Sequence, residues 1–198
     1  MKRWGAQAIR FEAPFLKKLK ITILKMATKN TEEQHKIMVL LGSGGHTGEM
    51  MYILSSLKKE YSTQISSVST NDDSISPIKF TRRFPTSRNF SIPRPRKVGQ
   101  SYFTSIFTTI YAAFATFILL LKQRPDCIIS NGPALCVPFF YLAKIISIFT
   151  QKPIKLLYIE SLCRISSLSL SGKLVKPICD KFIVQSELLN GDYAEMTS

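Results

Sequence analysis

The feature that most constrains this chain is a glycine-rich turn that directly follows a short apolar run. The run covers 36–41 (KIMVLL) and leads into Gly42-Ser43-Gly44-Gly45-His46-Thr47-Gly48. Such a run, ended by glycines, is typical of a buried strand that enters a tight turn. After the turn, apolar residues recur at helical spacing up to Leu57, and Glu49 stands where the helix dipole favours an acidic first turn. The pattern predicts a strand, a glycine loop and a helix.

The same alternation continues along the chain. Further strands are expected at 64–69, 126–130, 155–159 and 181–184, and apolar helices at 102–121 and 134–149. The stretch 70–98 is rich in proline and basic residues, so it is predicted to be mostly loop, with room for a short strand near 90–92. A Gly/Ser-rich connection is expected before the last strand. Strands that alternate with helices predict an α/β fold with a parallel, doubly wound sheet.

The composition is that of one globular domain. The 198 residues are 45% hydrophobic and 20% charged, which is too apolar for a disordered chain and too evenly interrupted for a polytopic membrane protein. Lys and Arg number 27 against 13 Asp and Glu, a formal charge of +14. A basic surface attracts phosphate-rich partners, whether nucleic acid, anionic lipid or a nucleotide, and charge alone does not choose among them.

The cysteines and histidines give no sign of a metal site. No CxxC pair is present, and the pattern favours buried small hydrophobes in a reducing compartment for Cys127, Cys136, Cys163 and Cys179. With two histidines in the chain, a zinc constellation is not expected. We therefore predict neither a metal nor a cofactor.

Two segments bear on membranes. The stretch 11–27 carries apolar residues at helical spacing among lysines, which suits a helix lying on an anionic membrane surface, an ordinary packing helix, or a poorly ordered leader. It lacks the uninterrupted apolar core of a signal peptide. The 23 uncharged residues 99–121 have the length to cross a bilayer, but polar residues dilute the first half. A crossover helix with one apolar face is the better prediction.

Candidate site residues follow the strands, because ligands of open parallel sheets bind at the carboxyl edge. The glycine loop comes first, and its backbone N–H groups at a helix N-terminus predict a diphosphate site, with a ligand-free turn as the alternative. It matches neither a Walker A motif nor the dinucleotide fingerprint. His46 is a candidate general base or phosphate donor, or else a residue that orients the turn. The other clusters are Asn131-Gly132-Pro133, Glu160-Ser161 with Arg164, and Gln185-Ser186.

Several motifs in one order resemble a known family. They are GSGGHTGEM, Arg88 with GQSYFTSI, PDCIISNGPALCVP, YIESLCRISSLSLSGKL and DKFIVQ. Together, over roughly 37–185, they resemble the membrane-anchoring subunit of the endoplasmic-reticulum UDP-N-acetylglucosamine transferase, asparagine-linked glycosylation family member fourteen. That family is related to the N-terminal half of the bacterial lipid-II glycosyltransferase.

The resemblance implies a parallel Rossmann-like sheet that forms the N-terminal half of a split GT-B glycosyltransferase. It assigns 36–198 to the acceptor-side domain, and the residue pattern leaves 1–35 as a basic amphipathic leader for which membrane contact is one alternative. A small soluble catalytic subunit would hold UDP-N-acetylglucosamine. This chain would be a non-catalytic or acceptor-binding subunit on the cytosolic face of the endoplasmic reticulum membrane and the contiguous nuclear membrane. The joint reaction adds the second N-acetylglucosamine, β-1,4-linked with inversion, to N-acetylglucosaminyl-diphospho-dolichol.

An inverting transfer needs a base at the acceptor hydroxyl and support for the leaving diphosphate. His46 and Glu160 are the candidate catalytic residues. The expected acceptor and diphosphate contacts are Gly42, Ser43, Gly44, Gly45, Thr47, Gly48, Asn131, Gly132, Arg164, Ser169 and Ser171. Family members usually begin with a hydrophobic anchor helix and carry Trp-Pro after the last strand. This chain has its basic leader and Ser186-Glu187-Leu188 at these two places, and the segment after the last strand is where we expect part of the partner contact.

Two other classes compete with this interpretation. A stand-alone nucleotide-sugar-binding or glycosyltransferase-like protein is disfavoured, because 198 residues hold one of the two domains of a GT-B cleft. A basic nucleic-acid-binding module is suggested by the charge and by Arg and Lys interleaved with phenylalanines in 80–90. The uncharged run and the lack of a recognition motif argue against it, so no nucleic-acid partner is expected.

Overall fold

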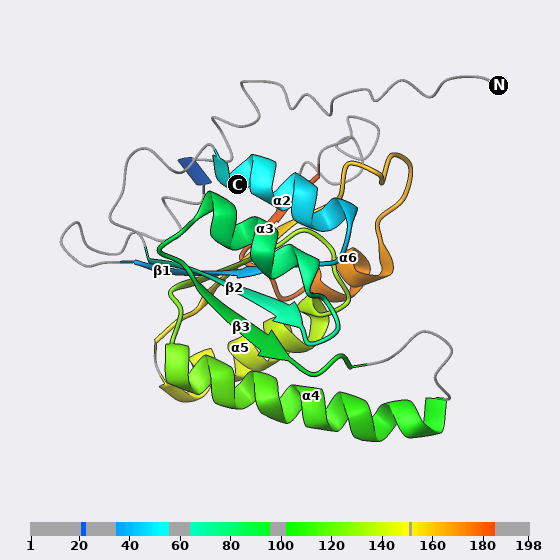
Figure 1. Ribbon diagram of the computed structural model, residues 1–198. Coiled ribbons are helices and arrows are strands. Elements are labelled where there is room, and N and C mark those ends of the chain that lie inside the picture. Colours follow the sequence, from blue (N-terminus) through cyan, green and yellow to red (C-terminus); the bar gives the residue numbers. More distant parts are fainter. Residues whose placement is uncertain (1–20, 23–34, 56–63, 96–101, 151, 185–198) are drawn as a thin grey trace.

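The structure is a computed structural model that describes residues 21–22, 35–55, 64–95, 102–150 and 152–184. Six strands alternate with helices (Figure 1). The strands are β1 (Lys36–Leu40), β2 (Gln64–Thr70), β3 (Arg88–Ile92), β4 (Cys127–Ser130), β5 (Lys155–Ile159) and β6 (Lys181–Ile183). The helices are α2 (Gly45–Ser55), α3 (Ile75–Arg83), α4 (Tyr102–Gln123), α5 (Cys136–Thr150) and α6 (Leu170–Val175).

All strand pairs of the sheet are parallel, and the strand order is β3-β2-β1-β4-β5-β6. The chain winds outward from β1 to one edge, then returns through α4 to β4 and winds to the other edge. The order therefore reverses between β1 and β4, where Val39 is paired with Ser67 on one side and Ile129 on the other. In a doubly wound sheet this reversal opens a crevice at the carboxyl ends of the strands. The predicted parallel α/β fold is confirmed.

Helices cover both faces of the sheet. In Figure 1, α2 and α3 lie above the sheet, and α4 and α5 lie below it. Alternate residues of β1 serve the two layers: Ile37 and Val39 pack with α2 and α3, while Met38 and Leu40 pack with α4 and α5. Because both faces are covered, β1 is apolar from Ile37 to Leu40 and β4 from Cys127 to Ile129, with no alternation of polar residues.

Two helices lie where the sequence predicted loop. Helix α3 occupies part of the proline-rich stretch, and α6 occupies part of the Gly/Ser-rich connection. Pro77 is the third residue of α3, where a missing N–H breaks no helical bond, and Asp73 Oδ1 accepts from the N–H groups of Ile75 (3.3 Å) and Ser76 (3.0 Å). The side chain of Ser169 caps α6 in the same way, because it accepts from Gly172 N–H. The loop prediction was wrong at these two places because Pro77 fits the first turn of α3 and Ser169 caps the start of α6.

The start of α2 also differs from the prediction. Helical geometry begins at Gly45, inside the glycine stretch, so Glu49 lies in the second turn instead of the first. Only the first part of the stretch is therefore loop. The apolar run beginning at 99 contains α4, and no helix of the described residues is long and apolar enough to cross a bilayer. The leader 1–35 lies almost wholly outside the described residues, of which Ile21 and Thr22 are helical.

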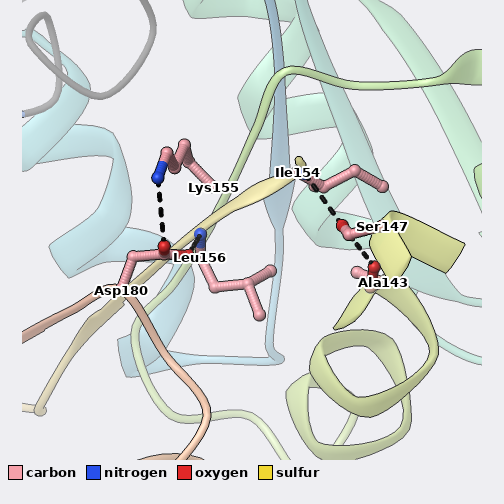
Figure 2. A network of polar contacts seen from close by, with 6 residues as sticks. All are labelled: Ala143, Ser147, Ile154, Lys155, Leu156 and Asp180. Atoms are coloured by element: carbon pink, nitrogen blue, oxygen red, sulfur yellow. Dashed lines mark hydrogen bonds and ion pairs between the residues drawn. The ribbon is translucent and has the colours of Figure 1, made fainter. Parts of the chain in front are cut away.

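Polar contacts fix the amino-terminal edge of the sheet, far from the crevice. Asp180, just before β6, accepts from the backbone N–H of Leu156 (2.9 Å) and pairs with Lys155 Nζ (3.2 Å), as Figure 2 shows. Beside it, Ser147 of α5 accepts from Ile154 N–H (2.9 Å) and donates to the carbonyl of Ala143 (2.7 Å). These bonds tie the start of β5 to α5 and to the residue before β6.

Candidate functional site

The glycine loop is held rigidly against its neighbours. Gly44 has φ +71°, a left-handed conformation that favours glycine. A Cβ on Gly42 would lie 2.8 Å from Cβ of Pro133, so the loops after β1 and β4 touch. Thr47 Oγ1 donates to the carbonyl of Gly42 and also contacts Ser76 Oγ of α3 at 2.8 Å. The loop is thus tied back to its own helix and to α3.

His46 lies against the turn that follows β4. Gly132 has φ +108°, and a Cβ there would lie 3.2 Å from His46 Cε1 and 3.3 Å from the hydroxyl of Tyr158. Glycine is therefore required at 132 both for its backbone angle and for space. The imidazole is half-buried, and its Nδ1 is buried without a hydrogen-bond partner among the described residues. Buried polar atoms normally have a hydrogen-bond partner, and the described residues supply none to this nitrogen.

A pocket of about 310 Å³ opens at the reversal of strand order. It lies at the carboxyl ends of β1 and β4, as expected for a doubly wound sheet. The polar or close-approach residues that line it are Gly42, Ser43, His46, Thr70, Arg94, Gly132 and Pro133. Loop amides beside the start of α2, together with a guanidinium, suit an anionic ligand.

Arg94 reaches this pocket from the segment after β3. Its guanidinium pairs with the carboxylate of Asp72. A hydrogen bond from the Thr70 side chain, and then the bond and charge of Arg94, lower the pKa of Asp72 below its ordinary value. Asp72 therefore stays ionised at neutral pH and keeps Arg94 oriented. A guanidinium has five donors, so Arg94 has N–H groups left for a ligand phosphate.

Glu160 lies outside the pocket. It is fully buried, and Oε1 accepts from Ser161 N–H at 3.1 Å. Its Oε2 accepts from both the backbone N–H and the hydroxyl of Ser169, each at 3.1 Å. Ser169 in turn accepts from Gly172 N–H (2.9 Å) and bonds the hydroxyl of Tyr158 (2.9 Å). Both carboxylate oxygens are thus occupied in holding the serine loop and the start of α6.

The remaining predicted residues fall into four places. Asn131 is buried behind the pocket and donates to the carbonyl of His46 (2.7 Å). Arg164 is exposed and does not line the pocket. Ser171 lies near the thiol of Cys136, whose pKa burial raises to about 12. Gln185 and Ser186 lie outside the described residues. The structure therefore brings Gly42, Ser43, His46 and Gly132 together in the pocket wall. The other predicted residues that it describes do not line the pocket: Gly44, Gly45, Thr47, Gly48, Asn131, Glu160, Arg164, Ser169 and Ser171.

Sequence reasoning missed two charged residues at the site. Arg94 was one of several basic residues in a presumed loop, and nothing in the sequence singled it out. Glu49 was assigned to a helix dipole, but it is 5% exposed and contacts the loops after β4 and β5. The signal for Glu49 was available, because it falls on the same helical face as Met50 and Ile53, which are buried. No group of three or more potential metal ligands occurs in the part of the chain that the structure describes.

Known structures resemble this fold. The chain superposes on MurG of Acinetobacter baumannii with a TM-score of 0.58 at 14% identity, covering 77% of this chain and 41% of that one. It superposes on a UDP-N-acetylglucosamine 2-epimerase with a TM-score of 0.60 at 14% identity, covering 84% of this chain and 46% of that one. Both are GT-B-type proteins of more than twice the matched length, so the chain has the fold of one half of such a protein.

Sequence relatives are more specific. Residues 37–198 match the family model described as "Oligosaccharide biosynthesis protein Alg14 like". The UDP-N-acetylglucosamine transferase subunit ALG14 of Candida albicans is 43% identical over 171 residues, which is 85% of this chain and 78% of the relative. The protein of the same name from Mus musculus is 34% identical over 184 residues, 87% of this chain and 85% of the relative. The predicted resemblance is confirmed, and this chain belongs to the Alg14 family.

Proposed function

We propose that this chain is the acceptor-binding, membrane-attached subunit of a UDP-N-acetylglucosamine transferase. A small soluble partner holds UDP-N-acetylglucosamine and closes the GT-B cleft. The complex adds the second N-acetylglucosamine to N-acetylglucosaminyl-diphospho-dolichol at the cytosolic face of the endoplasmic reticulum membrane. The names of the relatives support the transferase and its subunit character.

The observation that carries the proposal is the pocket at the carboxyl ends of β1 and β4. Its wall combines the glycine loop, the half-buried imidazole of His46 and the guanidinium of Arg94. Backbone N–H groups and a helix N-terminus favour phosphate oxygens, and Arg94 adds the cation that a diphosphate requires. A pocket of about 310 Å³ has room for a diphosphate with part of one sugar, so the lipid would remain outside.

Within this site, His46 is the candidate base for the acceptor hydroxyl. It lines the pocket beside the glycine loop, and a histidine side chain can act as a general base. Glu160 remains a proposal as well, but its two occupied oxygens favour a role in positioning Ser169 and Tyr158 over proton transfer. In the complex we expect His46→Ala to reduce transfer more than Glu160→Gln does.

The test is to co-express the chain with its soluble partner and to measure transfer from UDP-N-acetylglucosamine to N-acetylglucosaminyl-diphospho-lipid in pelleted membranes. Activity that requires both chains and pellets with membranes supports the proposal. Arg94→Ala should raise the KM for the acceptor while leaving the KM for UDP-N-acetylglucosamine nearly unchanged, because the donor belongs to the partner. A chain that reaches membranes but supports no transfer would overturn it.

Membrane attachment has its own structural support in α4. Four large apolar side chains at spacing i, i+3, i+4 and i+7 face solvent, each 61–65% exposed: Phe107, Ile110, Tyr111 and Phe114. A helix on a globular protein normally turns its apolar stripe inward. The stripe begins beside the pocket, because Thr108 Oγ1 donates to the carbonyl of Pro95, a pocket residue (2.8 Å). We propose that it rests on the bilayer and that the basic character of the chain adds attraction to anionic lipid.

We expect the double variant Phe107→Ser with Phe114→Ser to reduce binding to vesicles that contain anionic lipid at least about tenfold. The reason is that two aromatic side chains that would insert into the bilayer are lost. The measurement is vesicle co-sedimentation of the full chain. The matched control is Ile75→Ser with Ile78→Ser, an equally exposed apolar pair (62% and 54%) on α3, on the opposite side of the sheet (Figure 1). Equal losses from the two pairs would contradict a specific membrane face.

A further inference from the structure

The inference concerns Glu49, a carboxylate that lies almost completely buried behind the pocket. It is 5% exposed. Its Oε1 accepts from the hydroxyl of Ser161 at 3.0 Å, and its Oε2 accepts from Nδ2 of Asn131 at 3.3 Å. One side chain of α2 therefore holds the first residues after β4 and after β5. Taking a carboxylate out of water is costly, so a burial of this kind needs the hydrogen bonds that compensate it.

Asn131 connects Glu49 to His46 through a second hydrogen bond. Its Nδ2 group carries two hydrogens, and the second bond goes to the carbonyl oxygen of His46 at 2.7 Å. Asn131 is fully buried, so solvent does not compete for either bond. The next residue is Gly132, which lies against the imidazole ring. Glu49 and Asn131 thus fix both the backbone of His46 and the surface on which its ring rests.

We propose that Glu49 is a positioning residue for His46, acting through Asn131. The inference rests on the proposed function for its catalytic consequence, but its structural part stands by itself. Reacting groups need placement to a fraction of an ångström, and a shift of about 1 Å can reduce a rate on the order of a hundredfold. The three loops that make this edge of the site come from separate βα units. Glu49 lies in α2, the helix that follows the first of these loops, and it bonds to the loops after β4 and β5.

The proposal requires the bridging geometry of Glu49 and not its charge. A glutamine at 49 can accept from Asn131 Nδ2 through its oxygen. Its amide nitrogen can donate to Ser161 Oγ, since a hydroxyl has two acceptor sites and now takes one bond from Cys163 N–H (3.3 Å). Glu49→Gln should therefore keep the three loops together, whereas Glu49→Ala removes both bonds and leaves two buried donors unpaired.

The first arm of the test reads His46 directly. The chain has two histidines, so ¹³C-labelled histidine in the full chain gives two Cε1–H signals, which His46→Ala assigns. We expect Glu49→Ala to move or broaden the His46 signal. The signal of His35, which precedes β1 at the amino ends of the strands, should stay in place. Glu49→Gln should leave the spectrum near that of the wild type. Ile53→Ala, a core change on the same helix, is the control for general loosening of α2.

The second arm measures transfer by the assembled complex. We expect Glu49→Ala to reduce kcat about tenfold or more, with the KM for UDP-N-acetylglucosamine within about twofold, and Glu49→Gln to recover most of the rate. If Glu49→Ala does not fold, Asn131→Ala breaks the same link from the other side and should move the His46 signal in the same way.

The outcomes separate the two proposals. An unchanged His46 signal in folded Glu49→Ala and Asn131→Ala overturns the positioning role, whatever the activity. Equal damage from Glu49→Gln and Glu49→Ala overturns the bridging geometry. Absence of transfer by the wild-type complex defeats the proposed function, and the spectroscopic arm still decides whether Glu49 positions His46.

Discussion

At the scale of single residues, Gly172 shows how closely the serine loop is packed. A Cβ at this position would lie 2.4 Å from Glu160 Oε2 and 3.1 Å from Ser169 Oγ. Both neighbours are already fixed by the hydrogen bonds that Glu160 makes with Ser169. We therefore expect Gly172→Ala to lower the free energy of unfolding by about 2 kcal/mol or more, since it must displace a buried carboxylate.

Urea unfolding of the full chain measures this change, and Gly48→Ala supplies a matched control. Gly48 lies within α2 and is exposed, and a Cβ added to it would have no neighbouring atom within 4 Å. Alanine is a better helix former than glycine, so Gly48→Ala should raise the free energy of unfolding by up to about 1 kcal/mol. If both variants change it in the same direction, the tight packing of Glu160 against Gly172 is refuted.

At the scale of elements, the carboxyl end of α4 carries a strained residue. Arg124 follows the helix with φ +45°, and its N–H donates to the carbonyl of Leu120 at 2.9 Å. Glycine is the usual residue in this left-handed cap, because a Cβ is unfavourable there. We expect Arg124→Gly to raise the free energy of unfolding by about 0.5–1 kcal/mol.

The same urea measurement distinguishes this from a general effect of glycine. Lys122 lies two residues earlier and is exposed in the last turn of α4. Lys122→Gly should lower the free energy of unfolding by up to about 1 kcal/mol, because glycine is a poorer helix former than lysine. Two variants that destabilise equally would mean that Arg124 is not strained.

At the scale of the whole molecule, two cysteines buried in the core make the free energy of unfolding depend on pH in the alkaline range. Burial raises the pKa of the Cys127 and Cys136 thiols from 9.0 to about 12. Below pH 9 both thiols are protonated in the folded and unfolded chains alike. As pH rises from 9 toward 12 the unfolded chain releases these protons and the folded chain keeps them, so stability is lost over that range.

We expect the free energy of unfolding to fall above about pH 9 by up to about 1.4 kcal/mol per pH unit for each thiol. Urea unfolding at several pH values between about 8.5 and about 10.5 measures the slope. Lysines and tyrosines also titrate there, so the informative comparison is with Cys127→Ala combined with Cys136→Ala. That variant should show a shallower slope, and an identical slope would exclude the thiols as the cause.

Several features could be predicted from local sequence. The strands could be located because their apolar runs stay buried on both faces, and the glycine turn after β1 could be identified because few other residues tolerate its backbone. The helix α3 could not, because Pro77 looks like a break until its place in the first turn is known. His46 was identified from its place after a strand, whereas Arg94 was one basic residue among many.

The sequence by itself determined the alternation of strands and helices, the glycine loop and membership of the family. Only the tertiary structure decided the strand order, the pocket between β1 and β4, and the burial of Glu49 and Glu160. The physical reason is range. Strand and turn preferences act between neighbours along the chain, whereas the contacts from Asn131 to His46 and from Ser161 to Glu49 join residues 85 and 112 positions apart. Such contacts exist once the parallel sheet has set the carboxyl ends of its strands side by side.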